Sequence, residues 1–70
     1  MKTMTNKQRA ARTAKLLRQY NKYDLPESCL IDILADVRHW CDWHGHDFAK
    51  LDREAFGHYV AEISEEKETF

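Results

Sequence analysis

The chain has 70 residues, of which 43% are hydrophobic and 33% are charged. A chain of this length forms one domain with a small core, since it buries only ~60% of its unfolded surface. The charged fraction, with apolar runs no longer than three residues, is untypical of a membrane protein. Two cysteines are too few for a secreted disulfide scaffold, so we expect a cytoplasmic protein with reduced thiols.

The net charge of −1 hides a separation of the two signs along the chain. Residues 1–22 hold seven basic residues and no acidic one, whereas residues 23–70 hold four basic and all twelve acidic residues. Such a separation is typical of a nucleic-acid-binding arm. It also fits two halves that attract each other, or an acidic half that meets a basic partner.

Two glycines and one proline leave few turns, which favours long helices over short strands. The first helix is expected over residues 5–21, because Thr5 and Gln8 in "TNKQ" have the spacing of a capping box. Its apolar face is thin, so we expect it to pack more weakly than the other helices. The face consists of Ala10, Thr13, Ala14, Leu17 and Tyr20.

The second helix is expected over residues 24–44. Asp24 can cap it, Glu27 completes a second capping box, and Pro26 fits the first turn, where an N–H has no intrahelical role. Gly45 suits the left-handed position that follows a helix. A wide apolar arc makes this the core helix, with Trp40 as a packing anchor. The arc consists of Cys29, Leu30, Ile33, Leu34, Val37, Trp40, Cys41 and His44.

The third helix is expected over residues 48–66 and carries another continuous apolar stripe. The stripe consists of Phe48, Leu51, Ala55, Phe56, Tyr59, Val60 and Ile63. Gly57 inside this helix costs ~1 kcal/mol relative to alanine, and a close contact with another helix would explain its presence.

Three helices joined by short loops predict an all-α fold, a compact three-helix bundle. A hairpin of the second and third helices, with the first helix docked on it, fits the same pattern. We expect a single helical domain over residues 1–70, with frayed ends at residues 1–4 and 67–70.

The stretch "HWCDWHGHDF" at residues 39–48 gathers residues that can bind metal or react. Cys41 and His44 lie one turn apart and His46 follows, but no paired spacing supplies the four ligands that zinc needs. Cys41 with His44 could also form a reactive thiolate pair, yet Cys41 lies on the predicted core face and no third group orients the histidine. We therefore expect no metal, no cofactor and no enzyme.

One side of the second helix combines Trp43 with acidic residues. Trp43 either packs over a neighbouring helix or is exposed among acids, as in a protein-binding hot spot. Ile31 points away from the core arc and suits a second contact strip, such as a dimer seam. The candidate partner-binding residues are Ile31, Asp32, Asp36, His39 and Trp43.

The basic first helix offers a nucleic-acid interface through contacts with phosphates. Its candidate residues are Lys7, Arg9, Arg12, Lys15, Arg18 and Lys22. A pI near 6.4 and the lack of a helix-turn-helix signature argue against this function. We favour a structural role, in which the basic segment faces the acidic remainder.

The pattern "DILADVRHWCDxxGxDFxxLDRxAxxHY" over residues 32–59 resembles small uncharacterised proteins of bacteriophages, plasmids and other bacterial mobile elements. The resemblance covers about half of the chain and implies a bacterial or phage cytoplasm and an accessory role, without a biochemical activity.

The leading expectation is a non-catalytic accessory protein that binds a host or phage protein, with inhibition of a host defence system as one such role. A nucleic-acid-binding protein that uses the first helix is the first alternative. A small metal-binding domain is the second.

Overall fold

A computed structural model describes residues 4–68 of the chain and shows three helices with no strand among these residues. They are α1 (Asn6–Tyr20), α2 (Pro26–Trp43) and α3 (Phe48–Glu68), and every pair is in contact. The all-α, three-helix fold predicted from the sequence is confirmed. Of the ends that we expected to fray, residues 1–3, 69 and 70 lie outside the described residues. None of the three described helices is long and apolar enough to cross a membrane.

The first helix begins with the predicted capping box. The Thr5 hydroxyl accepts from the Gln8 amide at 3.1 Å, and the Thr5 amide donates to Gln8 Oε1 at 2.9 Å. Two N-terminal amides that lack an intrahelical partner are thereby satisfied. At the other end, the Asn21 amide donates to the Leu17 carbonyl at 3.2 Å and closes the helix.

The start of α2 differs from the prediction. Leu25, not Asp24, is the N-cap residue, and no side chain caps the helix. The reason is Pro26, which disfavours helical geometry in the residue before it and holds Leu25 extended at φ −66°, ψ 140°. The Asp24 carboxylate instead accepts from the Leu25 amide at 2.8 Å.

The end of α2 is a Schellman motif centred on Gly45, as the sequence indicates. Gly45 has φ 72°, a conformation that only glycine adopts without strain. The Gly45 amide donates to the Asp42 carbonyl at 3.4 Å, and the His46 amide donates to the Cys41 carbonyl at 2.8 Å. Asp47 then begins α3 by accepting from the Lys50 amide at 3.4 Å.

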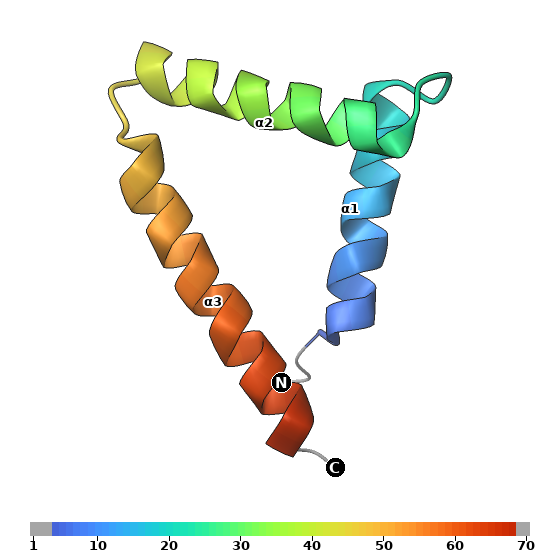
Figure 1. Ribbon diagram of the computed structural model, residues 1–70, viewed down its shortest axis with the longest axis vertical. Coiled ribbons are helices and arrows are strands. Elements are labelled where there is room, and N and C mark those ends of the chain that lie inside the picture. The colour runs from blue at the N-terminus through green and yellow to red at the C-terminus, as the bar shows by residue number, and fades with distance from the viewer. Residues whose placement is uncertain (1–3, 69–70) are drawn as a thin grey trace.

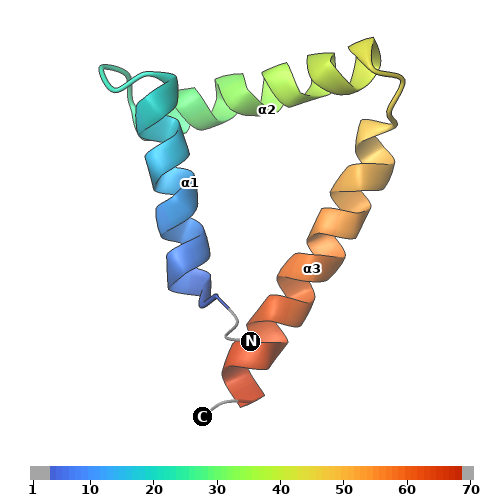
Figure 2. The ribbon, with the colours of Figure 1, turned by 180° about the vertical axis from the view of Figure 1, so that it is seen from behind.

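The helices lie as the three sides of a triangle and meet near their ends (Figures 1 and 2). At the α2–α3 corner, the Arg38 guanidinium lies 4.2 Å from the centre of the Phe48 ring. At the α1–α3 corner, Arg9 Nε lies 3.2 Å from Glu62 Oε2 and Asn6 Nδ2 donates to the Glu62 carbonyl at 3.1 Å. The molecule is flat, with extents of 40 × 31 × 21 Å.

Among the described residues, only Cys29 (1% exposed) and Cys41 (2%) have buried side chains. Both lie on α2, one towards each neighbouring helix. The expectation that Trp40 is a packing anchor within the chain is wrong, because 52% of its surface is exposed. α1 reaches along α2 as far as Asp36, yet Leu34, Val37 and Trp40 of the apolar arc stay at least 39% exposed.

The stripe of α3 is also largely uncovered. Phe48 and Ile63 are half-buried, while the other five residues of the stripe are exposed. The contact predicted at Gly57 is absent as well: a Cβ atom there would meet nothing within 4 Å. Gly57 is therefore not explained by a close approach of helices within one chain.

Candidate functional site

Asp32, Asp36, His39 and Trp43 form one line along α2, which we call the acidic-aromatic strip. Their spacings of four, three and four residues place them on one side of the helix, and all four are exposed. Ile31 lies about 100° around the helix from Asp32 and is 67% exposed. The structure thus leaves all five sequence-predicted partner-binding residues accessible and groups four of them.

Trp43 is the most exposed member of the strip. It is 87% exposed in the last turn of α2, so the interpretation that it packs over a neighbouring helix is wrong. The geometry of the corner explains this exposure. Cys41 is the side chain that this corner buries, and Trp43 lies two positions, or about 200°, further round the helix. Burying one residue therefore turns the other towards solvent.

Asp36 is held in place by α1. The Tyr20 hydroxyl donates to Asp36 Oδ2 at 2.8 Å, between side chains that are 16 residues apart. This hydrogen bond, with smaller effects from burial and from the Asp36 and Asp32 charges, raises the pKa of Tyr20 from 10.0 to about 12. The sequence pattern places Tyr20 on the apolar face of the first helix and does not predict this contact. The 3.6-residue period gives a side chain's face but not its partner.

Beside Asp36 the surface is hollowed. A shallow apolar pocket of about 350 Å³ is lined by residues of α1 and α2, with both Tyr20 and Asp36 among them. The lining residues are Leu16, Tyr20, Ile33, Asp36, Val37 and Trp40. The charged strip thus borders an apolar surface that could receive a side chain.

The histidines next to Gly45 stack on Trp40. The ring centres of Trp40 and His44 are 4.4 Å apart, and those of Trp40 and His46 are 5.3 Å apart with nearly parallel planes. His44 Nδ1 also lies 2.9 Å from the Trp40 carbonyl oxygen. Within residues 4–68, no group of three or more His, Cys, Asp and Glu side chains is placed to hold a metal ion.

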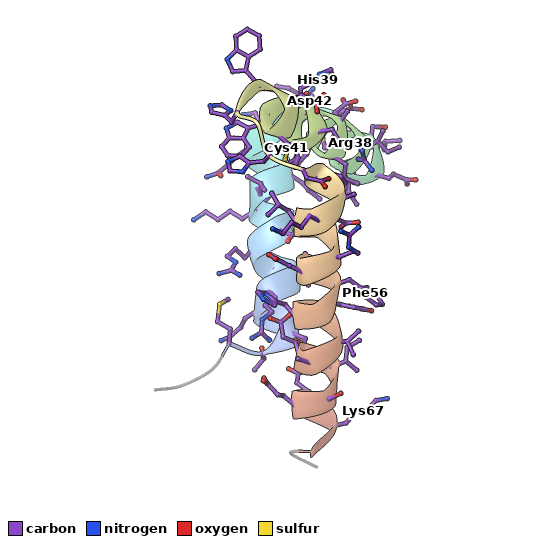
Figure 3. All side chains as sticks on the ribbon, turned by 90° about the vertical axis from the view of Figure 1, so that its left-hand side faces the viewer. Arg38, His39, Cys41, Asp42, Phe56 and Lys67 are labelled. Atoms are coloured by element: carbon purple, nitrogen blue, oxygen red, sulfur yellow. The ribbon has the colours of Figure 1, made fainter. Side chains whose placement is uncertain are left out.

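The two cysteine thiols are enclosed. Cys29 Sγ donates to the Asn21 carbonyl at 3.4 Å, and its burial, with the charges of Asp24 and Asp32, raises the pKa of the thiol. A raised pKa leaves less of the nucleophilic thiolate at neutral pH. Cys41 lies inside the α2–α3 corner, beneath the exposed Arg38, His39 and Asp42 (Figure 3).

The basic side chains of α1 divide into two groups. Arg9 points towards α3, where it pairs with Glu62. It also donates to Oδ1 of Asn6 in its own helix at 2.7 Å. The other five candidate residues are exposed: Lys7, Arg12, Lys15 and Arg18 on α1, and Lys22 just after it. The attraction expected between the basic segment and the acidic remainder is thus represented by one ion pair within the described part of the chain.

Comparisons of the chain with protein-family models, with curated proteins and with solved structures found no match.

Proposed function

We propose that this protein is a non-catalytic accessory protein of a bacterial or phage cytoplasm, and that it acts by binding another protein through the acidic-aromatic strip. The observation that carries the proposal is Trp43, a tryptophan that is 87% exposed at the end of a line of acidic residues. Tryptophan is enriched among the few interface residues that supply most of the binding energy. A tryptophan that stays exposed to water adds little to the stability of the folded chain, so a binding role would explain its position.

The strip indicates the chemistry of the partner. An apolar pocket would take the Trp43 ring, and basic groups beside it would pair with Asp32 and with the free oxygen of Asp36. Because Tyr20 already holds Asp36, less side-chain freedom is lost when a partner binds. We place the target among host or phage proteins, with a host defence complex as one such target. The resemblance of residues 32–59 to proteins of mobile elements supports this choice.

The experiment is capture from the natural host with wild-type protein, with Trp43→Ala and with Tyr23→Ala. Tyr23 is a matched control, because it is an aromatic residue that is 88% exposed but lies outside the strip. A protein retained by the wild type and by Tyr23→Ala, but lost by Trp43→Ala, is the expected result. Its affinity for the purified Trp43→Ala variant should fall by at least ~30-fold, which corresponds to a hot spot of about 2 kcal/mol. Equal capture by all three proteins would contradict the proposal.

Nucleic-acid binding is the competing function, and five exposed basic side chains, four on α1 and Lys22 just after it, favour it. Such a face contacts phosphates without reading base sequence. We rank it second because the chain as a whole has a net charge of −1 and a pI near 6.4, whereas nucleic-acid-binding domains are typically basic.

A further inference from the structure

The chain exposes far more surface than a folded monomer of its mass. Its accessible surface is 6417 Å², whereas a folded monomer of 8.3 kDa exposes about 4,600 Å². The excess is therefore about 1,800 Å². The radius of gyration agrees: it is 14.4 Å, against about 11 Å for a compact domain of 70 residues and about 14 Å for one of 140 residues.

The exposed surface includes most of the apolar helix faces that the sequence predicts to form the core. On α2, the buried Cys29 and Cys41 lie about 120° apart around the helix, and most of the apolar arc between these two directions is exposed. We call the exposed large apolar residues of this arc and of the stripes of α1 and α3, together with Leu16 beside the α1 stripe, the inner stripes. They are Leu16, Tyr20, Leu30, Leu34, Val37, Trp40, Leu51, Phe56, Tyr59 and Val60, and each is at least 39% exposed.

We infer that the inner stripes are covered by a second copy of this chain, so that the protein is a homodimer whose apolar core lies between the two copies. The area supports a dimer. Covering the excess would bury about 1,800 Å² on each copy, or about 3,600 Å² in total, within the range of ~2,000–5,000 Å² of obligate homodimers. A single chain has little core of its own, since only two side chains are buried among the residues that the structure describes.

Charge also fits a second copy. Residues 1–22 carry a net charge of +7 and residues 23–70 carry −8, so two copies related by a two-fold axis can set each basic helix against the acidic part of the other. Such an arrangement is self-complementary, as a two-fold interface requires. Trp43 lies outside the arc between Cys29 and Cys41, so the inferred dimer need not cover it. The pocket beside Asp36 shares Leu16, Tyr20, Val37 and Trp40 with the inner stripes, so the second copy would fill that pocket.

The mass in solution tests this inference. Light scattering after gel filtration of the full chain should give twice 8.3 kDa at micromolar concentration. Val37→Glu puts a charge in the middle of the inner stripes and should return the mass to that of one chain. Tyr23→Glu places the same charge on the loop between α1 and α2 and should leave the dimer intact.

Trp40 gives a second readout that does not depend on whether Val37→Glu folds. With Trp43→Phe, Trp40 is the sole tryptophan, and its emission should shift to longer wavelength as dilution separates the copies. Three results would overturn the inference: a monomer whose Trp40 emission is already that of a solvated ring, a monomer with a radius of gyration near 11 Å that covers its own stripes, or a dimer that Val37→Glu leaves intact.

Discussion

The hydrogen bond between Tyr20 and Asp36 gives Tyr20 a raised pKa that a titration can detect. We predict that a titration followed by tyrosinate absorbance includes a group with a pKa of about 12, which belongs to Tyr20. Tyr20→Phe should remove the late group, and Asp36→Asn should move it to lower pH by removing both the acceptor and its charge. A wild-type titration that is complete well below pH 12 would contradict the contact.

The same group makes stability depend on pH in a defined window. The pKa of Tyr20 is higher in the folded chain than in the unfolded chain, so its contribution is fully present below pH 10 and is lost as pH rises towards 12. The free energy of unfolding, measured in urea, should therefore decline more steeply between these values for the wild type than for Tyr20→Phe. A parallel decline of both proteins would show that the hydrogen bond does not contribute.

At the scale of the helix, the two glycines should respond in opposite ways to alanine. Gly57 lies inside α3 with open space where a Cβ would be, so Gly57→Ala should stabilise the protein by ~0.5–1 kcal/mol. Gly45 has φ 72°, so Gly45→Ala should destabilise it by ~1–2 kcal/mol. Urea midpoints measure both changes. A loss of stability in Gly57→Ala would show that another surface approaches α3 at this position.

The basic helix offers a second test at this scale, with Arg12, Lys15 and Arg18 changed together to glutamine. We predict little change in stability, because among the described residues only Arg9 of α1 forms an ion pair, and exposed pairs contribute only ~0.2–1 kcal/mol. We also predict unchanged, weak DNA binding in a titration at low salt. Tight, salt-sensitive binding by the wild type that the triple variant loses would make nucleic acid the leading partner.

The helices were predictable because their signals are local. The Thr5–Gln8 capping box and Gly45 act within a few residues, and the structure confirms both. The start of α2 was missed because two local signals compete there: Asp24 has the chemistry of a cap, but Pro26 fixes the backbone of the residue between them. Proline prevails because its restriction is covalent, whereas a capping hydrogen bond contributes only about 1 kcal/mol.

At the scale of the whole molecule, the sequence predicts which faces are apolar but not what covers them. The period of α2 marks Trp40 as core, and the structure leaves it half-exposed because a repeat along one helix carries no information about helix placement. The candidate site shows the same limit. Trp43 lies at the edge of the apolar arc, where a small rotation of a neighbouring helix decides between burial and exposure.

The corner between α1 and α3 differs from the other two corners in the sequence separation of the residues that it brings together. It joins Asn6 and Arg9 to residues 62–66, whereas each other corner joins helices that follow one another directly. The two corners between consecutive helices can therefore form through contacts that are local in sequence. The α1–α3 corner requires the two ends of the chain to meet, which carries the entropy cost of closing a loop of nearly the whole chain. The contacts that close it are polar and partly exposed, so dissolved ions weaken them. Raising the ionic strength should accordingly open this corner before it disturbs the corners that enclose Cys29 and Cys41.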